Sequence, residues 1–231
     1  MIKLLGIIPA KKNSSSIKNK NFLKIGKKRI IDQSIEVLKK SKYINYKFVD
    51  TDSIEIANYS KKLGINIPFL RPKKLALKNS PVYKTILNSL LKLEKFYKTK
   101  FDAIILLQPT SPLRTTRHVN KAIESFIKLK STTMVSICPI EEPHPFKIFK
   151  INNKKITCLI KHKRKNLNRQ FLPKFFKLNG AIYIVKRDYF IKKKKFVSEN
   201  SNYYLMENKD SINLDTKNDL ILYKNFLKKI E

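Results

Sequence analysis

The chain has 231 residues, of which 42% are hydrophobic, and a formal net charge of +34 at pH 7. This size and apolar content suit one α/β domain and exclude global disorder. The chain has only two cysteines and no apolar run near ~20 residues, which favours a cytoplasmic protein without a membrane span. The charge alone favours a polyanion partner, but the lysines are spread over every segment, so nucleic-acid binding is the less favoured interpretation.

The first predicted element is a buried strand at residues 3–10, KLLGIIPA, followed by a polar loop that reaches Asn21. A short continuous apolar run is typical of a parallel strand that is buried on both faces. The loop contains no acid and no glycine, and it carries four lysines: Lys11, Lys12, Lys18 and Lys20. It either binds an anion or is one more solvated, lysine-rich surface loop.

Strands and amphipathic helices then alternate along the first 138 residues. Further strands are predicted at residues 46–52, 101–107 and 133–138. Each predicted helix has one apolar face, formed by Ile31, Ile35 and Leu38; by Ile54, Ala57 and Leu63; by Ile86, Leu90, Leu93 and Tyr97; and by Val119, Ile123 and Phe126. This alternation predicts an α/β fold with a doubly wound, mostly parallel sheet, in which ligands bind at the carboxyl ends of the strands.

The alternation of strands and helices stops at Pro139. We expect a small insert at about 139–178 within a single domain of residues 1–231. The insert contains two short predicted strands joined by a turn at NNKK, residues 152–155, and then an irregular basic stretch. NGAIYIVK is predicted to return as a strand of the sheet, and SINLDT to form a short strand or a loop. A last helix is expected from about 217 to 230, with Leu220, Tyr223, Leu227 and Ile230 on its apolar face.

Several motifs along the chain resemble those of the acylneuraminate cytidylyltransferases, the CMP-sialic acid synthetase family. IIPAKKNSSSIKNKN, residues 7–21, stands where that family has IIPARGGSKGIPRKN, and LLQPTSPLRT, residues 106–115, is nearly the family's own string. NGAIYI and SINLDTKNDL follow in the family's order, and PFLRP and the pair Arg169–Gln170 also match. The matches extend over almost the whole chain, and together they are specific.

The resemblance implies a nucleotidyltransferase that joins CTP to a nonulosonic, sialic-type acid and releases pyrophosphate with the help of Mg²⁺. It also implies a Rossmann-like domain whose small insert forms a homodimer. A polar loop after the first strand suits this chemistry, because nucleotidyl transfer requires neutralised phosphates and an oriented attacking oxygen.

The resemblance also assigns nucleotide contacts. It places Lys11 and Ser14 in the phosphate loop, Lys20 and Asn21 against the nucleotide, and Arg71 beside the cytidine. A planar guanidinium that makes several hydrogen bonds suits a polar base. The alternative for Arg71 is an arginine that satisfies loop carbonyls.

The sugar acid is assigned four contacts by the same resemblance. Gln108 stands beside a turn fixed by two prolines. Arg169 matches an arginine that reaches the acid, either within one chain or across a dimer. Asn179 and Tyr183 are candidates for the sugar pocket. Tyr183 is equally compatible with a place in the core, and Arg169 is one basic residue among many.

Asp215 and Asn213 are the predicted Mg²⁺ ligands, and Lys20 and Asp215 the predicted catalytic residues. A carboxylate near phosphates is a natural ligand for Mg²⁺, but Asp215 also stands where an N-cap of the last helix would be. Asp219 is interpreted as a possible first-turn acid of that helix.

The departures from the family motif concern phosphate and metal. Lys12 and Asn13 replace two glycines, Lys11 replaces an arginine, and Asn213 replaces a metal-binding aspartate. These changes leave open a homologue that binds nucleotide or sugar without efficient catalysis, and a polyanion-binding protein is the more distant alternative.

Overall fold

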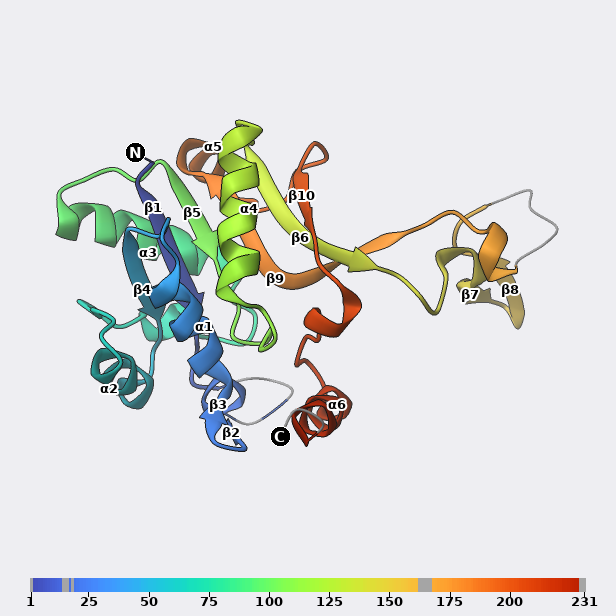
Figure 1. Cartoon of the computed structure of the whole chain (residues 1–231), viewed down its shortest axis with the longest axis horizontal. Coiled ribbons are helices and arrows are strands. Elements are labelled where there is room, and N and C mark those ends of the chain that lie inside the picture. The colour runs from blue at the N-terminus through green and yellow to red at the C-terminus, as the bar shows by residue number, and fades with distance from the viewer. Residues whose placement is uncertain (1, 14–16, 18, 162–167, 229–231) are drawn as a thin grey trace.

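A six-stranded sheet forms the centre of the molecule, with helices on both faces (Figure 1). The computed structural model describes residues 2–13, 17, 19–161 and 168–228. The strand order is β10–β6–β9–β5–β1–β4, formed by β1 (Leu4–Pro9), β4 (Tyr46–Asp50), β5 (Ala103–Leu106), β6 (Thr133–Pro139), β9 (Phe176–Lys186) and β10 (Asn202–Leu205). β9 is antiparallel to its neighbours β5 and β6, and the other pairs are parallel. The predicted mostly parallel sheet is therefore confirmed.

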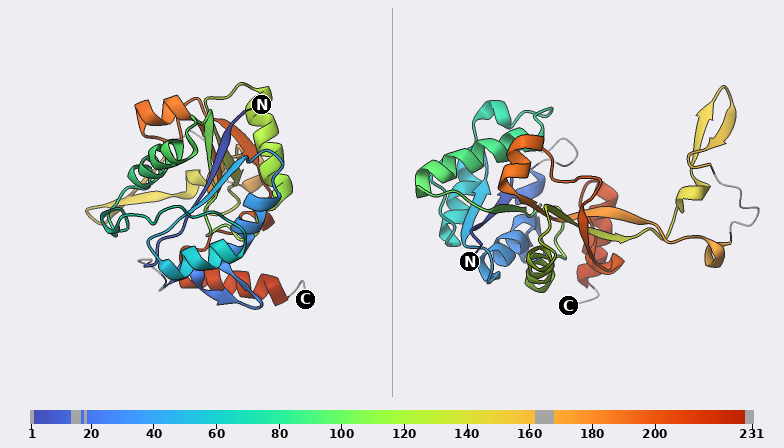
Figure 2. Two further views of the ribbon diagram at one scale, coloured as in Figure 1. Left: turned by 90° about the vertical axis from the view of Figure 1, so that its left-hand side faces the viewer. Right: turned by 90° about the horizontal axis from the view of Figure 1, so that it is seen from above.

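The helices form two layers around this sheet, as the side view in Figure 2 shows. One face is covered by α1 (Ile30–Lys40) and α4 (Thr116–Lys128), and the other by α3 (Val82–Tyr97) and α5 (Arg187–Lys193). The apolar faces predicted for α1, α3 and α4 point into the core.

The apolar face predicted for α2 (Ile54–Lys62) is partly wrong. Ile54 is 66% exposed, and the helix buries Ile56, Ala57 and Ser60 instead. Ile54 is the first helical residue, and the contact of α2 with the core begins only with Ile56. The 3.6-residue period identified the helix but did not show where along it the packing starts.

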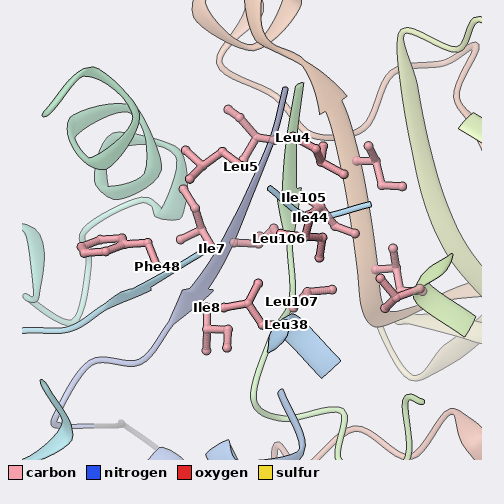
Figure 3. Packing of buried hydrophobic residues seen from close by; sticks show 14 of the residues in the cluster. Leu4, Leu5, Ile7, Ile8, Leu38, Ile44, Phe48, Ile105, Leu106 and Leu107 are labelled. Atoms are coloured by element: carbon pink, nitrogen blue, oxygen red, sulfur yellow. The ribbon is translucent and has the colours of Figure 1, made fainter. Parts of the chain in front are cut away.

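Buried hydrophobic side chains pack around β1, as Figure 3 shows. Leu4, Leu5, Ile7 and Ile8 are all fully buried, so this strand is covered on both faces, as its continuous apolar run predicts. Gly6 lies between them, and a Cβ atom at this position would stand 2.3 Å from Leu38 Cδ1. Close packing of α1 against β1 therefore requires glycine at position 6.

Three short elements carried no clear signal in the sequence: α5, β10, and a hairpin of β2 (Lys24–Ile25) and β3 (Lys28–Arg29). β10 is a four-residue edge strand whose outward side chains are polar or half-exposed, and its pairing with β6 is non-local. SINLDT forms a loop. It leads into α6 (Lys217–Lys228), which packs with Leu214 and the hairpin through Leu220, Tyr223 and Leu227.

Between β6 and β9 the chain leaves the sheet, and residues 140–161 and 168–175 form a projecting arm (Figures 1 and 2). The two flanking strands extend toward it, with Pro139 paired to Phe176. The arm ends in the hairpin β7 (Phe149–Asn152) and β8 (Lys155–Cys158), whose turn residues have positive φ, as the predicted NNKK turn requires. Residues 162–167 of the predicted basic stretch lie outside the described residues. None of the described helices is long and apolar enough to cross a bilayer.

We predict that Gly6→Ala lowers the free energy of unfolding by about 1–3 kcal/mol, because the added methyl group overpacks the contact between β1 and α1. Urea denaturation measures this change. Leu38→Ala alone should destabilise by about 2–5 kcal/mol through the cavity that it leaves. The double variant should lose less than the sum, because Leu38→Ala removes the nearer of two clashing methyl groups and leaves Ile44 Cγ2, which would stand 2.8 Å from the added Cβ atom. Strict additivity would contradict this account.

Candidate active site

An open pocket of about 430 Å³ lies at the carboxyl ends of the parallel strands β1, β4 and β5. Chain order reverses here, because β4 and β5 lie on opposite sides of β1. The lining comes from four separate segments: Pro9, Lys11, Lys20 and Asn21; Arg71, Leu75, Leu77, Ser80, Val82 and Thr85; Gln108, Pro109 and Thr110; and Asp215. Six of the residues predicted from the sequence therefore line one pocket.

Two hydrogen bonds hold the start of the loop after β1 in place. Asn21 Nδ2 donates to the Lys11 carbonyl at 3.0 Å, and the Lys12 amide donates to Asp52 Oδ1 at 2.8 Å. These two bonds fix the start of the loop against its end and against the segment after β4. Ser14, a predicted phosphate contact, lies outside the described residues.

Lys20 is the more buried of the two lysines that line the pocket. It begins the 3₁₀ turn η1 (Lys20–Phe22), and it is 8% exposed. Its ammonium group lies 3.0 Å from Asp215 Oδ1, although the two residues are 195 positions apart in the chain. The Asp215 side chain is 60% exposed and faces the pocket. This ion pair joins the first polar loop to the segment that precedes α6.

The beginning of α6 shows which residue forms its cap. Asp219 Oδ2 accepts hydrogen bonds from the amides of Asp215 and Thr216, and Thr216 Oγ1 accepts from the Asp219 amide. Burial opposes ionisation of Asp219, but the bonds from Thr216 and Asp215 outweigh it and hold the pKa of this carboxyl below its usual value. The alternative that Asp215 is the N-cap is therefore wrong, and its carboxylate remains available to the pocket.

Arg71 enters the pocket as half of a buried ion pair with Asp50, the last residue of β4. Arg71 Nε donates to Asp50 Oδ1 at 3.0 Å, and Arg71 Nη2 donates to the Asp50 carbonyl at 2.7 Å. Burial raises the pKa of the Asp50 carboxyl, and the charge of Arg71 opposes that shift. The pair fixes the plane of the guanidinium, so that its remaining N–H groups are aimed before any ligand arrives. Asp50 was not predicted, although an acid at a strand end was visible in YKFVD.

Gln108, Gly180 and Asn213 form a narrow contact at the side of the pocket. A Cβ atom at Gly180 would stand 3.3 Å from Gln108 Oε1 and 3.6 Å from Asn213 Cγ. Gly180 has φ +76°, which also favours glycine. The absent side chain lets β9 approach the end of β5 and the segment before α6 at the same time.

Arg114 is fully buried directly behind this contact. Its Nη1 atom donates to the carbonyls of Gln108 at 3.1 Å and Ala181 at 2.7 Å, and Nη2 donates to Ser34 Oγ. Burial lowers the pKa of Arg114 to about 9, which leaves the guanidinium protonated at neutral pH. One side chain therefore ties the turn after β5 to β9 and α1.

Two predicted sugar contacts lie away from the pocket lining. Asn179 is 3% exposed, and its amide is bonded to Ser136, Ala181 and Ser211. Tyr183 packs edge-on against Phe196 in the core, and burial, with a smaller effect from Asp215, raises the pKa of its hydroxyl.

The 3₁₀ turn η4 (Arg169–Phe171) lies on the projecting arm, and the side chain of Arg169 is outside what the structure describes.

The side chains near Asp215 provide only part of a ligand set for a divalent ion. Within the described residues, no group of three His, Cys, Asp or Glu side chains could hold a metal. Asn213 Nδ2 donates to Asp215 Oδ2 at 2.5 Å, and Asn213 Oδ1 is buried without a hydrogen-bond partner. The residues present therefore fit an ion that takes most of its ligands from phosphates and water, with Asp215 as the protein's charged ligand.

Comparison with known proteins gives a consistent result. A model of the family described as "Cytidylyltransferase" matches residues 5–229. The chain is 31% identical, over 95% of its length and 92% of the relative's, to the CMP-N,N'-diacetyllegionaminic acid synthase of Campylobacter jejuni. It is 27% identical, over 95% of its length, to an N-acylneuraminate cytidylyltransferase of Escherichia coli, of which it covers 51%.

The fold has close structural neighbours. The structure of a CMP:2-keto-3-deoxy-manno-octonic acid synthetase complexed with CTP superimposes with a TM-score of 0.73. That match covers 99% of this chain and 100% of the neighbour, at 15% identity, so it supports the fold alone.

We predict that Arg114→Met lowers the free energy of unfolding by about 2–5 kcal/mol, because it removes the side-chain donor to the Ala181 carbonyl and one of the donors to the Gln108 carbonyl, which keeps the Ser34 hydroxyl. Arg117→Met removes the same charge from an exposed position on α4 and is the matched control, with an expected change below about 0.5 kcal/mol. Urea denaturation measures both. Equal stability of the two variants would contradict the anchoring role of Arg114.

Proposed function

This chain belongs to the cytidylyltransferase family, and from that membership we propose that it joins CTP to a nonulosonic acid, giving the CMP-sugar and pyrophosphate. The observation that carries the proposal is the pocket in which Lys11, Lys20, Arg71, Gln108 and Asp215 meet at the carboxyl edge of the sheet. The similarity to a CMP-legionaminic acid synthase over nearly the full length of both chains supports a nine-carbon sugar acid as the acceptor.

The triphosphate would lie along the loop after β1. Lys11 and Lys20 supply positive charge, and Lys20 is shielded from water, which strengthens its attraction for a phosphate oxygen. Asn21 acts mainly through the loop, because its amide nitrogen holds the Lys11 carbonyl. Because glycines of the family motif are replaced here, the backbone cannot come as close to the phosphates. The positive charge of the lysines would compensate for part of this lost interaction.

The cytosine would lie in the part of the pocket that Arg71 closes. Leu75, Leu77 and Val82 provide apolar walls for a flat ring. Asp50 fixes the guanidinium of Arg71, and a donor held in one orientation discriminates polar base edges at a small entropic loss.

The transfer step requires the anomeric hydroxyl of the sugar acid to attack the α-phosphorus in line, as the bond to pyrophosphate breaks and pyrophosphate leaves. Gln108 lines the pocket beside Thr110 and is aimed by the fixed turn after β5. Lys20 would neutralise charge on the phosphates. A Mg²⁺ ion, when bound, would supply further charge neutralisation at the phosphates, with Asp215 and, more weakly, Asn213 as its protein contacts.

We also propose a homodimer formed through the arm. In the β7–β8 hairpin, Phe149 pairs with Cys158 and Ile151 with Ile156, which places these four side chains on one face. Ile151 is 81% exposed, and Phe149 and Ile156 are also largely exposed. A two-stranded hairpin with an uncovered apolar face is not stable alone, and the same face of a second copy is its natural cover. In a dimer, Arg169 on the arm would be available to the partner's pocket.

The test of catalysis is pyrophosphate release from CTP and Mg²⁺ with N-acetylneuraminic, legionaminic and pseudaminic acids. We expect turnover with at least one acid. Lys20→Met and Asp215→Ala should each lower kcat/KM by about 100-fold or more, through the loss of charge at the phosphates. Lys24→Met, an exposed change on β2, is the matched control and should leave the rate unchanged.

The same assay separates the alternatives. A native rate for Asp215→Ala would contradict its assignment. No turnover with any acid, together with a thermal shift by CTP, would favour a homologue that binds without catalysis. A salt-sensitive shift of random DNA without CTP binding would favour the polyanion interpretation.

For the dimer, we predict that Ile151→Glu combined with Ile156→Glu converts the protein to a monomer in size-exclusion chromatography with light scattering. Two charges on the apolar face should prevent its burial. Asn152→Glu combined with Thr157→Glu adds the same charge to the opposite face of the hairpin and should leave the dimer intact. A wild-type monomer at tens of micromolar would exclude the proposal.

A further inference from the structure

We infer that this site holds a divalent ion only together with the nucleotide, and that Lys20 and Asn213 prevent the nucleotide-free protein from binding one. The inference rests on the proposed function for the identity of the nucleotide. Its starting point is that, among the described residues that line the pocket, Asp215 is the only acidic one.

Both oxygens of the Asp215 carboxylate are already occupied. Oδ1 accepts from the Lys20 ammonium at 3.0 Å, and Oδ2 accepts from Asn213 Nδ2 at 2.5 Å. An ion that approached either oxygen of this carboxylate would have to share it with a hydrogen-bond donor that is already bound there. The Asn213 amide therefore acts here as a competitor for Asp215, with its nitrogen toward the carboxylate and its oxygen buried.

Lys20 is also an electrostatic obstacle to a second cation. Its side chain is only 10% exposed, so water screens its charge little. A divalent ion beside Asp215 Oδ1 would stand next to that ammonium group, and the nearby carboxylate of Asp219 is engaged by the amides of Asp215 and Thr216 at the cap of α6. The charge of Asp215 is thus already balanced by Lys20 in the nucleotide-free pocket.

A triphosphate changes this balance. Its oxygens accept hydrogen bonds from lysine and bind Mg²⁺, which commonly takes one or two carboxylates plus phosphates and water as ligands. Lys20 can then turn to a phosphate and release Asp215 Oδ1, while the nucleotide brings the ion and the negative charge that the protein lacks. Nucleotide and ion are therefore expected to bind as a unit.

The probe is Mn²⁺ alone, followed by electron paramagnetic resonance, because bound Mn²⁺ loses the sharp signal of the free ion. The wild-type protein without nucleotide should show no binding below about 1 mM, and CTP should produce it. Asn213→Asp and Lys20→Met should each improve nucleotide-free Mn²⁺ binding by about tenfold or more, the first by adding a carboxylate and the second by removing the competing cation.

Asn200→Asp is the matched control, since it makes the same charge change at an exposed position outside the pocket, and it should leave Mn²⁺ binding unchanged. Thermal denaturation confirms that each variant is folded. Wild-type binding of Mn²⁺ without nucleotide below about 1 mM would overturn the inference, as would two folded variants with no gain.

The two proposals fail in different ways. If wild-type protein does not bind CTP in a thermal-shift assay, the proposed function fails. The nucleotide-free Mn²⁺ titrations of Asn213→Asp and Lys20→Met do not involve CTP, and they decide the roles of these two residues independently.

Discussion

The buried guanidinium of Arg114 is the contact on which the geometry of the pocket depends. It donates to two carbonyls, Gln108 and Ala181, and to the hydroxyl of Ser34, and thereby joins the end of β5 to β9 and α1. No carboxylate among the described residues balances its charge by an ion pair, so its stability derives from hydrogen bonds in a fully buried site. Because β9 is held at this point, Gly180 can approach Gln108 and Asn213, and the lateral wall of the pocket forms.

Two ion pairs position the charged side chains that line the pocket. Asp50 fixes Arg71 at the end of β4, and Asp215 meets Lys20 across the pocket. They differ in exposure: the first pair is buried and serves as a rigid part of the wall, whereas Asp215 is 60% exposed. Separating the two residues of a buried ion pair costs much free energy. In a half-exposed ion pair, either residue can exchange its partner for a phosphate or an ion. The same pocket therefore contains one fixed and one exchangeable charge contact.

Much of the fold could be predicted from hydrophobic pattern. The continuous run around Ile7 indicated a strand covered on both faces, and the 3.6-residue period located α1, α3 and α4. Local pattern failed for β10, whose four residues become a strand only by pairing with β6, and for Ile54, whose exposure depends on where α2 meets the core. Motif resemblance predicted six residues that line the pocket. It could not show that the Asn179 amide is fully used by Ser136, Ala181, Ser211 and Met206.

The sequence by itself determined the class of fold, the position of the first polar loop and the family to which the motifs point, because these depend on local pattern and on residue order. Only the tertiary structure decided which groups are free to meet a ligand. It assigned the cap of α6 to Thr216 and Asp219, and it placed the Lys20 ammonium on Asp215 across 195 residues of chain. The physical reason is that hydrogen-bond donors and acceptors are shared among neighbours in space, and no spacing along the chain states how that competition is resolved.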